Sequence, residues 1–237
     1  MTLTVGVLTP HAAPGPEVEL PELSHGRVSV VLSRVGSPDR DGLVASTEPA
    51  ALGRAAVDFA GFTLAAVSHA STTTGYVIGP DGESDLVDRL SQRFGVPAVA
   101  SCAAAVEALR AHGITRAQLV HPPWFAPEYD ELGASYFRDQ GFDATVTTAT
   151  GLPHDPAQVT APLVVDWVVD HVDDRAEALF LAGNGFRAAG AIDELERRTG
   201  RLVVEANQAV LWGVLTATGT ATGLPGYGRV LRDLGVV

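Results

Sequence analysis

The chain has 237 residues, of which 46% are hydrophobic and 19% are charged, so it can bury a sizeable core and is not disordered as a whole. Arginine and lysine together number 16 and all of them are arginine, against 28 acids, which gives a net charge of -12 at pH 7. The lack of lysine excludes a lysine Schiff base and a P-loop lysine, and the acidic balance argues against a nucleic-acid partner.

A single cysteine, Cys102, excludes an internal disulfide and a cluster of thiolate metal ligands. We interpret this thiol as an inert buried side chain. The apolar start, residues 2–10, is too short for a membrane span and lacks the basic residues of a signal peptide. We therefore expect a cytoplasmic protein that does not associate with membranes.

Short apolar runs alternate with amphipathic stretches along the whole chain. The runs predict strands at residues 3–8, 27–32, 63–68, 98–101, 117–121, 143–148, 178–182 and 202–205. The amphipathic stretches predict helices at 49–60, 84–94, 103–112, 128–140, 156–172, 188–199 and 208–218, and residues 81–83 (DGE) are interpreted as a turn that begins the second of these. Several strands are continuous Val/Leu/Ala runs, which is typical of parallel sheets with helices on both faces.

Two stretches of the chain share the same kind of glycine-containing joint between a predicted helix and a predicted strand. Residues 94–97 (FGVP) and 198–201 (RTGR) each follow a predicted helix and precede a short strand and then a helix that begins with small residues. This repetition predicts an α/β protein made of two similar Rossmann-like lobes, with the active site in the cleft between them. The first lobe comprises residues 1–98 plus 208–237 and the second 99–207; a single sheet of six to eight strands is the alternative.

Side chains that can carry chemistry follow four of the predicted strands, at residues 9–12 (TPHA), 68–75 (SHASTTTG), 120–124 (VHPPW) and 181–185 (LAGNG). Hydroxyls and free N–H groups at a strand-to-helix turn can bind an anion. Ser71, Thr72 and Thr73 offer hydroxyls and amides, and Gly183 and Gly185 let the backbone approach a ligand closely. Ordinary helix capping explains one such turn equally well. Two of them at corresponding places favour a carboxylate clamp.

These motifs resemble those of the aspartate/glutamate racemase superfamily, and most closely its arylmalonate decarboxylase and maleate isomerase branch. The resemblance covers nearly the whole chain and depends on residues 67–73 (VSHASTT), 103–114 (AAAVEALRAHGI), 178–185 (ALFLAGNG), 207–212 (NQAVLW) and 224–229 (LPGYGR). It implies a cofactor-independent enzyme that acts on a small carboxylate, and subunits that often pair as a homo-oligomer.

The chain departs from this superfamily at its two cysteine positions. Racemases and isomerases of the superfamily use one cysteine from each lobe, and the decarboxylase keeps only the second. The matching positions here are Ser71 and Gly183. Racemisation by two thiols and isomerisation by thiolate addition therefore lack their chemical agent. Decarboxylation needs an electron sink and then a proton, so it tolerates the loss best.

The resemblance implies the remaining parts of the site residue by residue. Thr72 and Thr73 would hold a carboxylate with the amides of Asn184 and Gly185, and Trp124 would stand where the family has a tyrosine. Pro10 and His11 occupy a strand exit that lines the cleft in the family. His11 is our first candidate for proton transfer, before His69 and His121. Ser71, Asn184 and His11 are thus the predicted catalytic residues, and no metal or cofactor is expected.

Three other functions fit the same residues. A binding protein that retained the cleft without the chemistry is favoured by the missing thiols. A biosynthetic enzyme that cyclises or eliminates on a carboxylated intermediate also fits. A hydrolase would use Ser71 with a histidine, although no G-x-S-x-G motif surrounds this serine. The histidines show no H-E-x-x-H spacing, and Gly183-x-Gly185 lacks the rest of a dinucleotide fingerprint.

Overall fold

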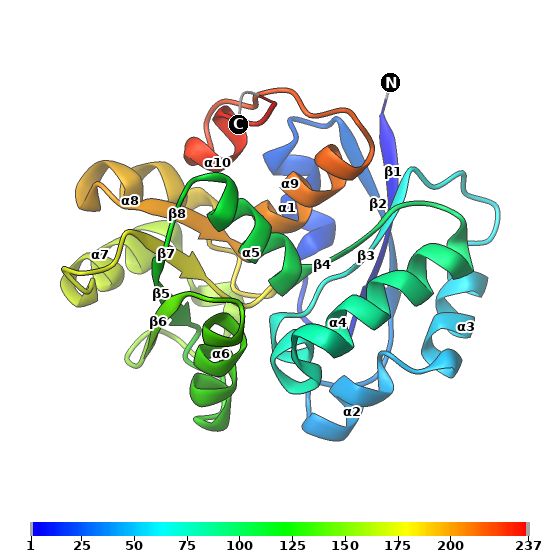
Figure 1. The fold of residues 1–237 in the computed structure, drawn as a ribbon, viewed down its shortest axis with the longest axis horizontal. Coiled ribbons are helices and arrows are strands. Elements are labelled where there is room, and N and C mark those ends of the chain that lie inside the picture. The colour runs from blue at the N-terminus through cyan, green and yellow to red at the C-terminus, as the bar shows by residue number, and fades with distance from the viewer. Residues whose placement is uncertain (1, 236–237) are drawn as a thin grey trace.

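In the computed structural model, which describes residues 2–235, two parallel four-stranded sheets lie side by side (Figure 1). The first sheet has the order β2-β1-β3-β4 and the second the order β6-β5-β7-β8. The strands are β1 (Leu3–Thr9), β2 (Val28–Arg34), β3 (Ala66–His69), β4 (Ala98–Ala100), β5 (Arg116–His121), β6 (Asp143–Thr148), β7 (Ala178–Leu181) and β8 (Leu202–Glu205). The two-lobed α/β prediction is confirmed, and the alternative of one larger sheet is wrong.

Helices connect the strands and surround both sheets. They are α1 (Pro16–Leu23), α2 (Arg40–Ala45), α3 (Pro49–Asp58), α4 (Thr72–Phe94), α5 (Ser101–Ala111), α6 (Glu128–Asp139), α7 (Ala161–His171), α8 (Ile192–Thr199), α9 (Ala206–Ala217) and α10 (Gly228–Arg232). Short 3-10 turns, Pro156–Gln158 and Ala189–Ala191, precede α7 and α8. The two predicted helices that included these turns are therefore shorter than expected.

Sequence patterns missed α1, α2, α10 and the first turns of α4. Helix α1 has only eight residues and contains Pro21, so its periodicity is weak. Helix α4 begins at Thr72, and Gly79 with φ 71° and ψ 174° interrupts it just before Pro80. Because Gly79 is not helical, α4 consists of two helical segments joined by a kink, and residues 81–83 lie in the first turn of the second segment, as predicted; Glu83 is buried there, 2% exposed.

The internal repetition seen in the sequence corresponds to equivalent places in the two lobes. Gly95 ends α4 before β4, and Gly200 ends α8 before β8, both with φ 69°. Helices α5 and α9 then follow β4 and β8, and they pack against each other between the two sheets (Figure 1). Helix α9 also contacts β3 and β4, whereas α10 contacts β8. The exact division of the chain into 1–98 plus 208–237 and 99–207 stays a prediction.

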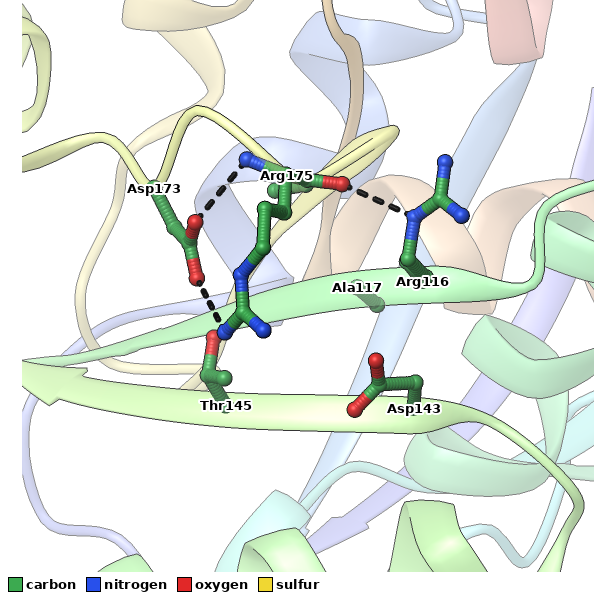
Figure 2. A pocket seen from close by; sticks show the side chains of 7 residues that line it. Arg116, Ala117, Asp143, Thr145, Asp173 and Arg175 are labelled. Atoms are coloured by element: carbon green, nitrogen blue, oxygen red, sulfur yellow. Dashed lines mark hydrogen bonds and ion pairs between the residues drawn. The ribbon is translucent and has the colours of Figure 1, made fainter.

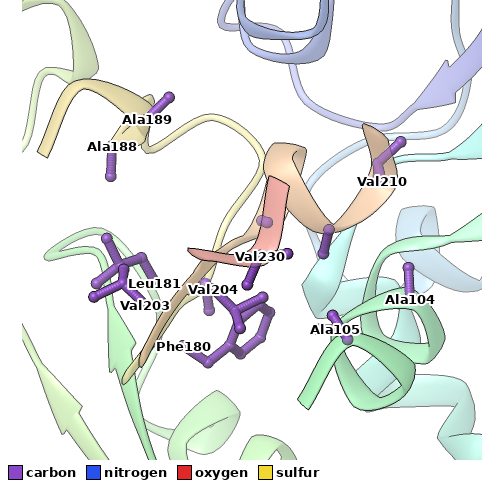
Figure 3. Packing of buried hydrophobic residues seen from close by; sticks show 14 of the residues in the cluster. Ala104, Ala105, Phe180, Leu181, Ala188, Ala189, Val203, Val204, Val210 and Val230 are labelled. Atoms are coloured by element: carbon purple, nitrogen blue, oxygen red, sulfur yellow. The ribbon is translucent and has the colours of Figure 1, made fainter. Parts of the chain in front are cut away.

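One apolar core extends through both lobes. It joins side chains of β1 to those of β7 and β8 by way of α5 and α9, and Figure 3 shows Phe180 and Val204 of the second sheet beside Ala105 of α5. A smaller cluster lies under α3 and α4 of the first lobe. Because both lobes share the larger core, the strand ends that face the site are held in a fixed position relative to each other. Among the described residues, no helix is long and apolar enough to cross a membrane.

Candidate active site

The turn after β3 carries the cluster of hydroxyls. The Ser71 side chain caps α4: its Oγ accepts hydrogen bonds from the Thr74 N–H at 3.2 Å and from the Thr74 hydroxyl at 2.9 Å. Within residues 2–235 no histidine nitrogen lies within hydrogen-bond distance of Ser71. A hydrolase with Ser71 as nucleophile therefore lacks a base.

Thr72 differs from its neighbours because its hydroxyl is buried and has no partner among the described residues. Thr72 and Thr73 are the first two residues of α4, so their N–H groups have no intrahelical acceptor, and Ser71 bonds to the Thr74 N–H and to the hydroxyls of Thr73 and Thr74 instead. The helix dipole adds positive potential at this end. An unpaired hydroxyl and two unpaired amides thus lie together in a place that suits an anion.

The turn after β7 forms the corresponding place in the second lobe. Gly183 has φ 95°, and the Phe186 N–H bonds back to the Gly183 carbonyl at 2.8 Å. Within the described residues the N–H groups of Gly183, Asn184 and Gly185 have no acceptor. Successive free N–H groups in such a turn bind anions. A Cβ at Gly183 would lie 3.2 Å from Pro122 and 3.3 Å from Phe125, so a cysteine there would be strained by both φ and packing.

The two turns meet at the start of α5. The Ser101 hydroxyl donates to Asn184 Oδ1 at 3.0 Å, and the Cys102 thiol donates to the Thr72 carbonyl at 3.4 Å. Since Ser101 and Cys102 are consecutive, the turns after β3 and β7 lie next to each other. Burial, with a contribution from Glu83, raises the pKa of the Cys102 thiol well above its usual value, which agrees with its prediction as an inert residue.

A cavity of about 160 Å³ lies between the lobes, where strands of both sheets end. Its lining comes from the segments that follow β1, β2, β5, β6 and β7, namely His11, Ala12, Ala13, Pro38, Trp124, Phe125, Pro156, Gly183 and Gly185. The Trp124 ring meets Phe186 edge-on, with centroids 5.8 Å apart. A cavity of about 150 Å³ is known to hold benzene, so this one accommodates a small ring or alkyl group.

The three candidate histidines are all neutral around pH 7. Burial and the neighbouring Arg34 lower the pKa of His11 to about 4, and burial, with His11 nearby, lowers that of His69 to about 3. His69 Nε2 pairs with the Ser46 hydroxyl at 3.0 Å. Burial also lowers the pKa of His121.

His121 and His69 are engaged away from the cavity, but His11 is not. His121 pairs through Nδ1 with Asp130 at 2.8 Å and through Nε2 with the Tyr76 hydroxyl at 3.2 Å. His11 lines the cavity, and its Nε2 is buried without a partner among the described residues.

The predicted site residues thus fall into two groups. His11, Trp124, Gly183 and Gly185 line the cavity. The others are buried next to it and do not line it: Pro10, Ser71, Thr72, Thr73 and Asn184. The Asn184 side chain is turned toward Ser101 and Asn207, so only its main-chain N–H remains free for a ligand.

Sequence reasoning missed several residues of this region. Pro38, Phe125 and Pro156 line the cavity from loops without any motif. Glu19, which holds the turn after β7 from behind together with Asn207, lies on a helix that the sequence patterns missed. Asn207 begins the 207–212 motif, but its bonds to Glu19 and to Asn184 were not predicted. Phe125 follows Trp124 directly, and that adjacency could have identified it.

A second depression lies at the opposite end of the second sheet, among Arg116, Asp143, Asp173 and Arg175 (Figure 2). Its volume of about 10 Å³ is roughly the room that one water molecule needs. Its side chains pair with one another, since Arg175 bonds to Asp173 and Arg116 bonds to the Arg175 carbonyl. This place has no room for a substrate. Among the described residues, no group of three or more His, Cys, Asp or Glu side chains could hold a metal ion.

The fold and the site define a class of protein: two parallel α/β lobes with free main-chain donors beside an interlobe cavity. The family described as arylmalonate decarboxylase matches residues 41–231, and the chain therefore belongs to the arylmalonate decarboxylase family. Arylmalonate decarboxylase of Bordetella bronchiseptica is 26% identical over 174 residues, which cover 71% of this chain and 72% of that protein.

Solved structures show the same fold. Unliganded arylmalonate decarboxylase has a TM-score of 0.82 and 22% identity, covering 98% of this chain and 100% of its own. Maleate isomerase of Pseudomonas putida S16 has a TM-score of 0.85 and 20% identity, covering 98% and 99%. A maleate cis-trans isomerase of Nocardia farcinica, solved with a covalently bound succinylcysteine intermediate, has a TM-score of 0.84 and 20% identity, again covering 98% and 99%. The relatives are decarboxylases and isomerases, as the sequence predicted.

Proposed function

We propose that this protein is a cofactor-independent decarboxylase of small carboxylates that stabilises an enediolate without a catalytic thiol. The observation that carries the proposal is the pair of turns with unpaired N–H groups, Thr72-Thr73 after β3 and Gly183–Gly185 after β7, which meet at the start of α5. In an enclosed site such donors stabilise the charge that develops on a carboxylate during reaction.

The reaction follows from these donors. One carboxylate of a malonate-like substrate accepts hydrogen bonds from the two turns, and the bond from the central carbon to the other carboxylate breaks to release CO₂. The electron pair of that bond moves into the retained carboxylate and forms the enediolate, which then takes a proton on carbon. Isomerisation by thiol addition, for which the Nocardia farcinica relative shows a cysteine adduct, has no thiol at Ser71 or Gly183.

Because the family's cysteine is missing, another group must donate the proton to the enediolate. The lowered pKa of His11 means that its imidazolium form is scarce at neutral pH, so His11 is a poor proton donor. We assign the proton to water and give His11 the role of a neutral hydrogen-bond partner for that water or for the substrate. The Arg34 guanidinium, which bonds to the His11 carbonyl, fixes the position of this residue.

The cavity supports a substrate class. Its lining of prolines, alanines and the rings of Trp124 and Phe125 suits an apolar substituent, and its volume suits a phenyl or short alkyl group. We therefore propose aryl- and alkylmalonates of this size as substrates.

Turnover of such malonates tests the proposal. Purified protein is incubated with phenylmalonate, methylphenylmalonate and short alkylmalonates, and CO₂ release and deuterium incorporation from D₂O are followed. We expect CO₂ release with one deuterium on the product carbon. Absence of both across the panel, with the protein folded, would contradict a decarboxylase.

A binding protein without turnover is the second candidate, because neither family cysteine position holds a thiol. In that case phenylacetate or phenylmalonate raises the melting temperature and is recovered unchanged. A biosynthetic cyclisation or elimination remains an alternative chemistry for the same donors. The cytoplasmic location and the homo-oligomer expected from the sequence stay predictions.

A further inference from the structure

A chain of buried polar side chains runs from α1 to the turn after β7. Glu19 of α1, which is 3% exposed, accepts hydrogen bonds from the Ala189 N–H at 3.0 Å and from Asn207 Nδ2 at 2.6 Å. Asn207 Nδ2 also donates to the Asn184 carbonyl at 3.0 Å, and Asn207 Oδ1 accepts from Asn184 Nδ2 at 2.9 Å. Asn184 Oδ1 finally accepts from the Ser101 hydroxyl. This series of hydrogen bonds therefore connects one lobe to residues 183–185 after β7 in the other lobe, which we call the donor turn.

Glu19 sets the direction of every bond in this chain. An ionised carboxylate can only accept, so Asn207 must turn its Nδ2 toward Glu19 and its Oδ1 toward Asn184. A glutamine at position 19 offers one acceptor where the carboxylate offers two, and one of its two donor neighbours then faces an N–H₂ group. Reversing Asn207 relieves that clash but places its Oδ1 against the Asn184 carbonyl, which loses its donor.

The Asn184 carbonyl matters because it shares a peptide plane with the Gly185 N–H. In a trans peptide these two groups point in opposite directions. When Asn207 holds the carbonyl, the Gly185 N–H is directed away from the Asn207 side chain, and Gly185 lines the cavity. A Cβ on Gly15 would lie 2.0 Å from the same carbonyl oxygen, so α1 approaches this peptide as closely as a glycine allows.

Other charged groups surround Glu19. Glu205, the residue that caps α9, is fully buried, and its Oε1 has no partner among the described residues. Glu22 lies one turn further along α1, Arg187 lies in the loop after β7, and Tyr227 precedes α10. Burial raises the pKa of Glu205 well above its usual value and that of Glu19 to about 7. Of the two carboxyls, Glu19 is the one whose pKa lies near neutral pH.

We propose that Glu19 is a positioning residue for the donor turn: acting through Asn207, its carboxylate fixes the peptide of Asn184 and Gly185 and so sets the affinity of the site for carboxylates. This inference rests on the proposed function for its ligand class. It makes a separate statement about the ligand-free protein, which can be tested without turnover.

The first test compares Glu19→Gln with Glu22→Gln, an exposed glutamate on the same helix. Amide NMR shifts are measured in ligand-free protein. We expect Glu19→Gln to move the amide signals of Gly183, Asn184 and Gly185 while those of Thr72 and Thr73 stay in place, and Glu22→Gln to move neither group. Unmoved signals of the turn in a folded Glu19→Gln variant would overturn the proposal.

The second test uses wild-type protein and does not depend on a variant that folds. The amide signals of Ala189 and Gly185 are followed from pH 5.5 to 8.5. We expect both to titrate with one common midpoint near pH 7. If the Ala189 signal titrates and the Gly185 signal does not, or if neither does, Glu19 does not control the turn.

The third test measures binding of phenylacetate by calorimetry at pH 6 and pH 8. We expect the wild-type affinity to be higher at pH 8, where Glu19 is ionised, and the affinity of Glu19→Gln to be about tenfold lower at pH 8 and independent of pH. Equal affinities of Glu19→Gln and wild type at both pH values would refute the positioning role. Binding that behaves as expected without CO₂ release from malonates would refute only the decarboxylase.

Discussion

At the scale of single residues, two threonines on one helix turn differ in a way that separates binding from folding. The Thr74 hydroxyl donates a hydrogen bond to Ser71, whereas the Thr72 hydroxyl is buried without a partner among the described residues. A buried unpaired hydroxyl destabilises a folded protein unless a ligand forms a hydrogen bond with it. Thr72 therefore has the features of a residue kept for binding, and Thr74 those of a structural one.

Thr72→Val tests this distinction. Valine has the same shape, so the variant removes an unpaired hydroxyl without opening a cavity, and we expect its thermal stability to equal or exceed that of the wild type. Catalytic efficiency on phenylmalonate falls by about 100-fold, as for the loss of one donor to a developing oxyanion.

Thr74→Val is the matched control for this change. It breaks a bond to Ser71 and lowers stability by about 1 kcal/mol. Thermal unfolding and steady-state kinetics measure both variants. A Thr72→Val enzyme with full activity would exclude this hydroxyl from the site.

Local pattern predicted the donor turns but not the residues behind them. Thr72 and Gly183 stand where an apolar strand gives way to hydroxyls or glycines, and that junction is visible in one stretch of sequence. Glu19 and Asn207 are far apart in the chain and meet only through the packing of α1 against α9. No single-sequence pattern encodes a contact of that kind. The same holds for Glu83, which bonds to the Cys102 and Ala103 N–H groups and to Tyr136.

At the scale of elements, α4 shows why the predicted helix began too late. Gly79 and Pro80 interrupt the periodicity, and the residue before a proline disfavours the helical region. In the structure the backbone leaves the helical region at Gly79, and a second helical segment runs on from Pro80. The segment before Gly79 carries the donors of the site, and the longer segment after it packs on the first lobe.

Gly79→Ala tests whether this bend requires glycine. A Cβ there meets nothing within 4 Å, so any effect comes from the backbone, whose φ of 71° and ψ of 174° are accessible almost only to glycine. We expect a loss of about 1–3 kcal/mol in urea unfolding. Gly53→Ala, inside α3 and equally free of contacts, is the control, and it should gain about 0.5–1 kcal/mol. Equal effects at the two positions would mean that the bend is not strained by a side chain.

At the scale of the whole molecule, the sequence predicted the two-lobed plan because each lobe repeats one pattern of strand, turn and glycine. Continuous apolar strands indicated parallel sheets, and the stretches around Gly95 and Gly200 marked equivalent joints. The hydrogen bonds of buried polar groups between the lobes could not be predicted, since these groups lie on different elements and add to the shared apolar core. These groups, with the buried histidines, determine how the stability of the molecule depends on pH.

Buried histidines and buried glutamates act on that stability in opposite directions. The pKa of His11 falls from 6.5 to about 4 and that of His69 to about 3, while the pKa of Glu19 and of Glu83 rises from 4.5 to about 7. Between pH 4.5 and 6.5 the unfolded chain binds protons on the histidines that the folded chain does not, so the histidines make stability rise with pH. The folded chain keeps protons on the glutamates that the unfolded chain releases, so the glutamates make stability fall with pH.

We therefore expect a shallow dependence of wild-type stability on pH in this window, and opposite slopes in two variants. Glu83→Gln removes a group that makes stability fall with pH, so the stability of this variant should rise with pH. His69→Gln removes a group that makes stability rise with pH, so the stability of this variant should fall with pH. Each slope approaches about 1.4 kcal/mol per pH unit at most. Urea unfolding at pH 4.5, 5.5 and 6.5 measures the slopes, and these are independent of any uniform loss of stability that the substitutions cause. Parallel profiles for all three proteins would mean that neither side chain has a shifted pKa in the folded chain.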